Sequence, residues 1–457
     1  MTRTHVSLQQ NFAGIVLTQG DPGYDDAREI FNAMIDRRPA VIAQCRTVED
    51  VKAALAYGQR EGLDIAVRSG GHSVAGASVI DGGLVVDLRL MNEVSVDTDA
   101  RTATVAGGAT WADVDRACQP HGLATVGGRV SSTGVAGLTL GGGSGWFERK
   151  FGLASDALIS VDLVTADGRE VTASAEENPD LFWALHGGGG NFGVATRFVF
   201  ALQPLPVTAF ALLLWLPETA RTLLRTYRDM VDRGLPLDLG GGMAYLTGPP
   251  LPFVPDELQG RRLIGMIATY AGSEAEMRSA IAPLLALNPV ASMIAELPYT
   301  EIQSALDDPP GFRNYWSAQH LAALSDEAID VFIAQGEAML VPSPSQHLIL
   351  PWGGAVADHA ENWPQPHRSA AWVVHPFGLW EDPADDDYVI SWARNAVAGL
   401  QPYSTGAVYL NFIGNEGEDR IVSGFGRDNY DRLTRVKAEY DPANVFRLNH
   451  NIKPWTP

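Results

Sequence analysis

The chain has 457 residues, which is enough for two or three domains with sizeable hydrophobic cores. It is 46% hydrophobic and 19% charged, as is typical of globular enzymes, and its 33 basic and 54 acidic residues give a net charge of −21. This acidic balance argues against nucleic acid or an anionic membrane surface as the main partner. An anionic cofactor would have to be held by local backbone dipoles rather than by the overall field.

Cysteine usage and the lack of long apolar runs bear on the compartment. Cys45 and Cys118 have neither metal-ligand spacing nor the number needed for a disulfide framework, so they fit a reducing compartment. Residues 1–10 lack the apolar core of a signal peptide, and no run of about 18 apolar residues predicts a membrane span. We therefore expect a cytoplasmic protein without a metal site.

The first 201 residues are expected to mix helices and strands. Val41–Cys45 and Leu63–Arg68 are apolar strand candidates, and Thr47 caps an amphipathic helix between them, which predicts a parallel βαβ unit. An earlier helix is expected over Asp25–Arg37. Further strands are expected over Leu84–Leu88, Thr102–Ala106, Leu158–Thr165, Glu170–Ala173 and Val194–Ala201. Two short helices are expected, one from Thr110 to about Gly122 and one over Leu181–His186.

The composition changes near Pro204–Pro206, where longer strands begin to alternate with amphipathic helices. The expected strands are Ala209–Leu216, Leu263–Tyr270, Gln346–Leu350 and Ala371–Leu379. The expected helices are Glu218–Asp232, Glu274–Leu285 and Asp326–Met339. Aromatic residues recur here, and while most should be core, a few could line a pocket for a flat or sugar-like substrate. They are Tyr245, Phe312, Tyr315, Trp316, Trp352, Phe377 and Trp380. After this part, a strand is expected over Val408–Phe412 and a helix from about Asn429 to Glu439.

Glycine-rich stretches are the candidate ligand-binding loops. Gly70 and Gly71 follow a strand, and a turn there can aim backbone N–H groups at a pyrophosphate, with His72 directly after it. The alternative is a plain Gly-Gly turn with an incidental histidine. Residues 127–145 interleave glycine with apolar residues, which favours backbone lying against a flat ligand over a bulged strand and hairpin.

A third stretch contains Gly188, Gly190 and Gly193 in the spacing G-x-G-x-x-G. A dinucleotide fingerprint needs a strand before it and a helix after it. Here a helix precedes the glycines and the strand Val194–Ala201 follows them. The stretch is therefore interpreted as another loop that approaches a ligand closely.

Taken in order, these loops and several neighbouring motifs resemble the FAD-linked oxidases of the vanillyl-alcohol-oxidase (PCMH-type) fold, in the branch of berberine-bridge-enzyme-like and hydroxynicotine-oxidase-like proteins. The resemblance covers nearly the whole chain. The motifs that carry it are Arg68-Ser69-Gly70-Gly71-His72, Asp81 to Leu88, Gly141 to Trp146, Asn178 to Leu185 running into the loop to Gly193, Tyr409-Leu410-Asn411-Phe412, and Asp441 to Ile452. It implies an α+β protein with a two-part FAD-binding domain, residues 1–205 and 405–457. Residues 206–404 would form a substrate domain, an antiparallel sheet with helices on one face.

The resemblance also implies that FAD is bonded covalently, through His72 only. Many relatives carry a second attachment cysteine at the position of Val130, and Cys118 lies before that loop on an expected helix. Thr133 matches the position that governs the approach of oxygen, so it is counted with the catalytic residues. The residues that the resemblance places against FAD are Arg68, Ser69, Gly70, Gly71, His72, Ser73, Val130, Ser132, Thr133, Gly137, Gly141, Gly142, Gly145, Trp146, Gly190, Asn191, Gly193, Val194, Tyr409, Asn411 and Asn449.

Tyr409 and Asn411 are the other expected catalytic residues. They are two apart on an expected strand and therefore share one face. In relatives this tyrosine lies over the flavin and often helps to remove the substrate's proton. Because a free tyrosine has a pKa of about 10, it needs a cationic or hydrogen-bonding neighbour, and Arg447, His375 and His320 are candidates. The alternative is a buried tyrosine that only packs.

Two departures from the pattern concern flavin contacts. The chain ends in Asn449-His450-Asn451 where many relatives have Asn-Gln-Asn, and His186 stands where arginine is common. Neither departure removes a group that the chemistry requires.

The resemblance implies an oxidase. A hydride would pass from a small organic substrate (an alcohol, sugar, amine or phenolic intermediate) to FAD, and molecular oxygen would then accept the electrons as hydrogen peroxide. A natural-product tailoring enzyme, a dehydrogenase with another acceptor and a flavin-binding protein without turnover remain alternatives. The substrate is not predicted, because fold-level analogy does not reach it. A monomer and a homodimer both remain open.

Overall fold

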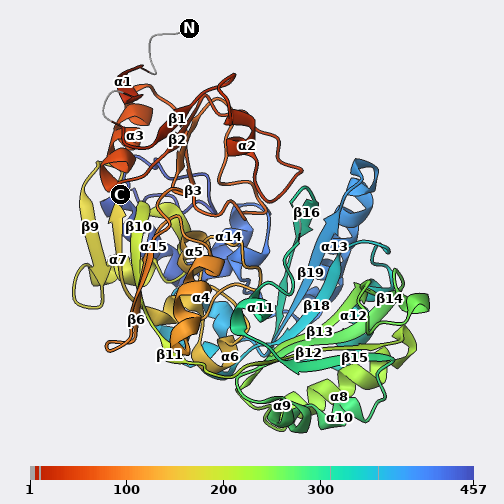
Figure 1. The fold of residues 1–457 in the computed structure, drawn as a ribbon. Coiled ribbons are helices and arrows are strands. Elements are labelled where there is room, and N and C mark those ends of the chain that lie inside the picture. The colour runs from red at the N-terminus through yellow and green to blue at the C-terminus, as the bar shows by residue number, and fades with distance from the viewer. Residues whose placement is uncertain (1–5, 10–11, 309, 359, 457) are drawn as a thin grey trace.

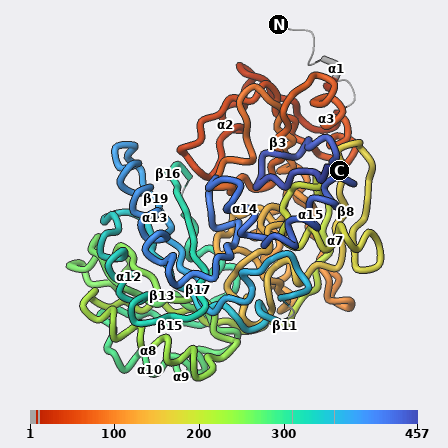
Figure 2. The backbone as a smooth tube through the Cα atoms, turned by 180° about the vertical axis from the view of Figure 1, so that it is seen from behind, coloured from red at the N-terminus to blue at the C-terminus, as the bar shows by residue number. Residues whose placement is uncertain are grey.

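The computed structural model describes residues 6–9, 12–308, 310–358 and 360–456 and shows a mixed α+β protein (Figure 1). Two main sheets and a two-stranded one come from the first part of the chain, and a large sheet comes from the middle. The C-terminal segment returns to lie beside the first part (Figure 2). The expected α+β class is confirmed. No helix in the described ranges is long and apolar enough to cross a bilayer.

The first sheet has the strand order β1 (Ile15–Leu17), β2 (Val41–Gln44), β4 (Leu84–Asp87), β3 (Ile65–Arg68). β2 and β3 each pair with β4 in parallel, so the expected parallel βαβ unit is confirmed, with β4 lying between its two strands. α3 (Val48–Arg60) connects them and begins with a capping box, in which the Thr47 hydroxyl accepts from the Asp50 N–H.

The helix expected over Asp25–Arg37 is wrong beyond its first turn, because α2 spans only Tyr24–Arg28. Asn32 reaches outward instead, and its side-chain amide donates to the carbonyls of Val74 (2.9 Å) and Asn314 (3.0 Å). Such bonds compete with the bonds of a helix. The segment after α2 therefore lies along neighbouring loops instead of coiling on itself.

The second sheet is antiparallel and has the order β5 (Val94–Asp97), β6 (Thr102–Ala106), β10 (Val194–Ala201), β8 (Leu158–Val164), β9 (Glu170–Ser174). Five helices share its hydrophobic core. They are α4 (Trp111–Cys118), α5 (Val135–Leu140), α7 (Pro179–Ala184), α14 (Glu418–Phe425) and α15 (Arg427–Tyr440). Because α14 and α15 come from the end of the chain, the first and last segments build one core. The short elements beside these sheets are α1 (Val6–Gln9), α6 (Glu148–Phe151), β7 (Leu123–Ala124) and β11 (Gln203–Pro204).

The large sheet is antiparallel throughout. Its order is β15 (Ala291–Glu296), β12 (Ala209–Trp215), β14 (Arg262–Tyr270), β13 (Leu239–Thr247), β18 (Gln346–Pro351), β19 (Trp372–Trp380), β16 (Arg313–Trp316), and β17 (Gln319–Leu321) also pairs with β19. Helices cover one face (Figure 1), namely α8 (Ala220–Asp232), α9 (Glu274–Ala280), α10 (Ala282–Leu285), α12 (Asp326–Glu337) and α13 (Asp386–Leu400). The short α11 (Tyr299–Gln303) follows β15.

Strand alternation decides which residues of this sheet face the ligand side. On β18, His347 and Ile349 point to the helices, and His347 stacks on Phe332 of α12. Gln346, Leu348 and Leu350 point to the other face and line a cavity. The middle sheet is therefore helix-covered on one side and ligand-facing on the other.

The strand expected over Val408–Phe412 is wrong. Leu410–Phe412 is a 3₁₀ turn, in which the Phe412 N–H bonds to the Tyr409 carbonyl at 3.0 Å. Asn411 donates to the Leu138 carbonyl at 3.0 Å, so its side chain ties this turn to α5 where a strand would need a neighbouring strand edge. The apolar and aromatic composition of this run is typical of a strand, but tertiary contacts decide its conformation.

Candidate functional site

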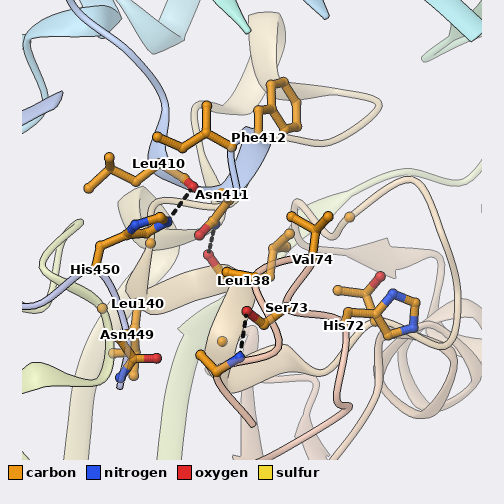
Figure 3. A pocket seen from close by; sticks show the side chains of 18 of the residues that line it. His72, Ser73, Val74, Leu138, Leu140, Leu410, Asn411, Phe412, Asn449 and His450 are labelled. Atoms are coloured by element: carbon orange, nitrogen blue, oxygen red, sulfur yellow. Dashed lines mark hydrogen bonds between the residues drawn. The ribbon is translucent and has the colours of Figure 1, made fainter. Parts of the chain in front are cut away.

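A cavity of about 680 Å³ opens between the glycine-rich loops and the ligand-facing side of the large sheet. Its size lies in the range of cofactor and ligand pockets. Four segments of the first and last parts of the chain line it, around residues 69–78, 128–146, 187–193 and 410–453. In Figure 3, Asn411 points toward Leu138, and His450 contacts the backbone of Leu410 on the side of the view opposite to His72.

The Gly70-Gly71 turn exists because two loops touch through their backbones. A Cβ on Gly70 would lie 2.3 Å from the Gly134 nitrogen, and a Cβ on Gly134 would lie 2.2 Å from the Gly70 nitrogen. Gly71 has a φ of 78°, a conformation that favours glycine. The buried Arg68 guanidinium fixes the base of the turn by donating to the carbonyls of Ala27 and Glu29. The turn thus aims His72 into the cavity.

The His72 ring is held on both sides. Its Nε2 lies 2.9 Å from the Ser132 hydroxyl, and its face stacks on Phe31 with ring centroids 4.2 Å apart. Burial, together with the nearby Arg68 charge, lowers the pKa of His72 to about 4. The imidazole is therefore neutral near pH 7 and has a free electron pair, as a nucleophile requires.

The second loop presents Val130, Thr133 and Gly137 to the cavity. The Thr133 carbonyl accepts from the Trp111 N–H at 3.0 Å, and Ser131 is held from the middle of the chain by Asp307, which accepts its N–H at 2.6 Å. Cys118 does not line the cavity. Burial raises its pKa to about 12, which keeps it a thiol.

The glycine positions of the turn after α5 leave no room for a side chain. A Cβ on Gly141 would lie 2.1 Å from the Asn411 side chain, and one on Gly142, which has a φ of 121°, would lie 2.4 Å from the Gln365 side chain. Gly145 leaves no more room, because a Cβ there would lie 1.7 Å from the Gly127 carbonyl oxygen. Trp146 beside it lines the cavity.

The third loop is anchored to the C-terminal segment. Asn191 donates to the carbonyls of Gly188 (2.6 Å) and His450 (3.1 Å), and its side-chain oxygen accepts from the Ile452 N–H at 3.0 Å. Gly190, Gly193 and Asn449 line the cavity beside it, whereas Val194 begins β10 behind it. The loop follows a helix and precedes a strand, so the rejection of a dinucleotide fingerprint is confirmed.

A buried ion pair supports this anchor. The Lys437 ammonium donates to the Asn191 carbonyl (2.7 Å), the Phe446 carbonyl (2.8 Å) and the Asp441 carboxylate (2.6 Å). Both charged side chains are fully buried. Every donor of the ammonium thus has an acceptor, and the loop is fixed to α15.

Tyr409 and Asn411 come together, though not by strand geometry. The Tyr409 hydroxyl oxygen accepts from Gly143 N–H (2.8 Å), Ser144 N–H (3.0 Å) and the Asn411 side-chain amide (2.8 Å). Asn411 lines the cavity, whereas Tyr409 is fully buried behind it. Burial raises the pKa of Tyr409 above its ordinary value of 10.0, although these three bonds act in the opposite direction.

The three candidate neighbours of Tyr409 lie in different places. His375 lines the cavity, Arg447 lines it while pairing with Asp64, and His320 is fully buried with neither ring nitrogen bonded in the described structure. His186 lies outside the cavity, where it stacks on Trp363 with centroids 3.8 Å apart.

Sequence reasoning missed several charged groups of the cavity wall, among them Arg129 and Asp308. Arg129 donates to Ser144 (2.9 Å) and Glu148 (2.7 Å), and an arginine among so many small residues was an available signal. Asp308 carries a carboxyl whose pKa is raised to about 6 by burial and by the neighbouring Asp307. No sequence pattern marked Asp308 as a site residue.

These residues fit FAD. The Ser69 hydroxyl is buried at the cavity without a hydrogen-bond partner in the described structure, as expected of a group that a bound anionic cofactor satisfies. The three glycine-rich walls leave room for a flat ring close to backbone. No group of three or more histidine, cysteine or acidic side chains within the described ranges could hold a metal ion.

Comparisons with known proteins agree with this fit. Residues 39–174 match the FAD binding domain family, and residues 408–453 match the family described as berberine and berberine like. The chain is 31% identical to (R)-6-hydroxynicotine oxidase of Paenarthrobacter nicotinovorans, with 99% of this chain and 98% of that protein covered. It is 32% identical to the FAD-linked oxidoreductase pgmH of Aspergillus terreus, with 98% and 95% covered.

Solved structures show the same fold. The crystal structure of 6-hydroxy-D-nicotine oxidase from Arthrobacter nicotinovorans superposes with a TM-score of 0.86 at 29% identity, covering 97% of this chain and 98% of that one. A chitooligosaccharide oxidase superposes with a TM-score of 0.84 at 24% identity, covering 99% and 100%, and shares the fold. The chain therefore belongs to the berberine-bridge-enzyme-like family of FAD-linked oxidases and is an FAD-dependent enzyme that oxidises a small molecule.

Proposed function

We propose that the enzyme holds FAD through one covalent bond to His72. The observation that carries the proposal is the neutral imidazole at the cavity wall, with Nε2 beside the Ser132 hydroxyl and Nδ1 unbonded in the described structure. A neutral ring nitrogen can attack an electrophilic carbon, whereas a protonated ring cannot. Val130 stands where a second attachment would need a cysteine, and the Cys118 thiol is buried elsewhere.

We further propose that molecular oxygen is the electron acceptor. FAD supplies two-electron chemistry when bound, and the protein supplies orientation and electrostatics. Thr133 lies in the cavity wall in the same loop as Ser132, and its small side chain leaves space for oxygen there. A tailoring enzyme would place labelled oxygen in its product, and a dehydrogenase would turn over with a dye but not with air.

For Tyr409, the geometry favours a positioning role. Its hydroxyl oxygen accepts hydrogen bonds from two backbone N–H groups and from the Asn411 amide, and its side chain does not line the cavity. We infer that Tyr409 fixes the turn at residues 142–144 and orients the Asn411 amide. Asn411 itself lines the cavity and can contact the cofactor.

The domain division remains part of this proposal. Residues 1–205 and 405–457 would form the FAD-binding domain and residues 206–404 the substrate domain. The core shared by the first and last segments supports that division, as does the core between the large sheet and its helices, which is drawn almost entirely from the middle of the chain. Cytoplasmic location, a role in secondary metabolism and a monomeric or dimeric state stay predictions.

Acid precipitation tests the attachment. The precipitated protein should stay yellow, and one FAD mass should be found on the tryptic peptide that contains His72. His72→Ala should release the flavin into the supernatant, while Cys118→Ser, the matched control, should keep it bound. Flavin released completely from the wild type would refute the covalent bond. Peroxide formation during turnover in air would then test the acceptor.

A further inference from the structure

One end of the cavity is an aromatic enclosure formed by Trp316, His375, Phe377 and Phe412, which all line it. His375 stacks on Phe412 with centroids 4.2 Å apart and ring planes 8° apart. Trp316 stacks on Phe377 with centroids 4.4 Å apart, and the Trp316 ring meets His375 edge to face at 5.8 Å. These rings come from β16, β19 and the 3₁₀ turn of the C-terminal segment.

The aromatic enclosure adjoins the attachment residue. Phe31 stacks on His72 at 4.2 Å and meets Trp316 edge to face at 6.0 Å. A ligand held among the four rings would therefore lie at the same end of the cavity as His72.

The floor of the aromatic enclosure is apolar apart from the amide of Gln346. Leu348 of β18 pairs with His375 of β19, and Gln346 pairs with Phe377, so their side chains form one patch. In β13, a Cβ on Gly242 would lie 2.4 Å from the Ile349 carbonyl oxygen, and the bare backbone there leaves a flat surface. The cavity-facing side chains of β13, β14, β18 and β19, all within the described ranges, carry no fixed charge. Such a wall suits a flat apolar ligand and would leave most hydroxyls of a sugar unpaired.

His375 offers a ring nitrogen as an acceptor in this wall. Its Nδ1 lies 2.8 Å from the Ser317 carbonyl oxygen, which can only accept, so Nδ1 carries the proton. Nε2 then keeps its electron pair and makes no hydrogen bond in the described structure. Burial is the main cause that lowers the pKa of His375, to about 4, so the ring is uncharged near neutral pH and Nε2 can accept a hydrogen bond from a ligand in the cavity.

We propose that the substrate is a flat aromatic compound bearing a CH–OH group, and that His375 is the catalytic residue that takes its hydroxyl proton. This inference rests on the proposed FAD-dependent function. In the reaction the O–H bond breaks and its proton passes to Nε2 of His375. The C–H bond breaks and its hydrogen leaves with the electron pair to FAD, the two-electron acceptor. A C=O bond forms in the product, and His375 returns its proton to solvent.

Ligand binding and flavin reduction under argon test the proposal with four probes. Naphthalenemethanol is compared with its saturated decahydro counterpart, with naphthalenemethylamine and with cellobiose. Binding is followed by tryptophan fluorescence and reduction by bleaching of the flavin. We expect naphthalenemethanol to bind at least about tenfold more tightly than the saturated alcohol, because the aromatic contacts are lost. The disaccharide should bind more weakly still, and the amine, a cation at neutral pH, should bind more weakly than naphthalenemethanol, because the wall offers no charged partner.

Two variants separate binding from chemistry. His375→Phe keeps a ring against Phe412, so binding should stay within about threefold while the reduction rate falls by about a hundredfold, the scale of a positioned acid–base group. His347→Phe, on the helix-facing side of β18, is the control and should change neither. The proposal would be overturned if the flavin of His375→Phe were reduced at the wild-type rate. It would also be overturned if the amine or the disaccharide bound more tightly than naphthalenemethanol, or if naphthalenemethanol did not bleach the flavin.

The outcomes also separate this proposal from the proposed function. Flavin retained on His72 with peroxide formed from the amine or the disaccharide would leave the oxidase assignment standing and refute the substrate class. Flavin lost on acid precipitation would refute the covalent bond, while binding of naphthalenemethanol would still support the aromatic enclosure.

Discussion

His347 makes the stability of this protein sensitive to acid. Its side chain is fully buried between Phe332, on which it stacks at 4.3 Å, and Trp392, and neither ring nitrogen has a hydrogen-bond partner in the described structure. Burial, with a smaller effect of His375, lowers the pKa of His347 from 6.5 to about 3. Between these two pH values the unfolded chain binds a proton that the folded chain does not.

The sign and size follow from proton linkage. The contribution of a neutral His347 is fully present above pH 6.5 and is lost as the pH falls toward 3. pH 5 lies 1.5 units below the pKa of 6.5 in the unfolded chain. Protonation of the unfolded chain therefore lowers the free energy of unfolding by about 2 kcal/mol at pH 5 relative to pH 8. That is a large part of a typical total stability of about 5–15 kcal/mol.

His347→Phe should remove this dependence. A phenyl ring of similar size keeps the stacking and leaves no unpaired ring nitrogens, so the variant should be at least as stable as wild type at pH 8. At pH 5 its advantage should grow by about 2 kcal/mol. Urea unfolding at both pH values measures the difference, and His121→Gln, at an exposed position, controls for the loss of one histidine. An equal difference at the two pH values would refute the reasoning.

Three further predictions concern the site. Lys437→Met should lower the free energy of unfolding by about 3–5 kcal/mol, because it leaves a buried carboxylate without its cation. Lys453→Met, in an exposed pair, should lower it by less than about 1 kcal/mol. Equal losses of the two variants in urea unfolding would contradict the role of burial. Tyr409→Phe should leave the anaerobic reduction rate within about threefold, far from the hundredfold loss of a catalytic base, and should lower the melting temperature, because it leaves two buried N–H groups unpaired. Thr133→Leu should slow reoxidation by air in stopped-flow mixing and leave anaerobic reduction intact; equal slowing of both steps would speak against an oxygen gate.

Local signals in the sequence predicted many elements well. The Thr47 cap starts α3, and the β-branched run Val194–Ala201 is β10 with the expected bounds. These signals are local because a cap or a strand pattern depends on residues within a few positions. The glycine loops were also predictable as close-approach loops, since missing side chains are visible in sequence.

Contacts between distant segments were not predictable. The helix after Tyr24 ends early because Asn32 bonds to Asn314, 282 positions away. The orientation of the Tyr409 hydroxyl depends on a hydrogen bond from the Gly143 N–H, 266 positions away. The aromatic enclosure depends on the pairing of β16 with β19, so sequence reasoning could name His375 only as one of several candidates.

The anchor between Lys437 and the third glycine loop has a consequence for synthesis. Lys437 bonds to Asn191, 246 residues earlier in the chain. At about 5–20 residues per second, the ribosome needs about 12–50 s to make the intervening segment. During that interval the large sheet can form its core with its helices, while the third glycine-rich loop still lacks its contact with Lys437. The FAD site is therefore completed late, after α15 has left the ribosome. Chains that end before α15 should be unable to form the complete FAD site.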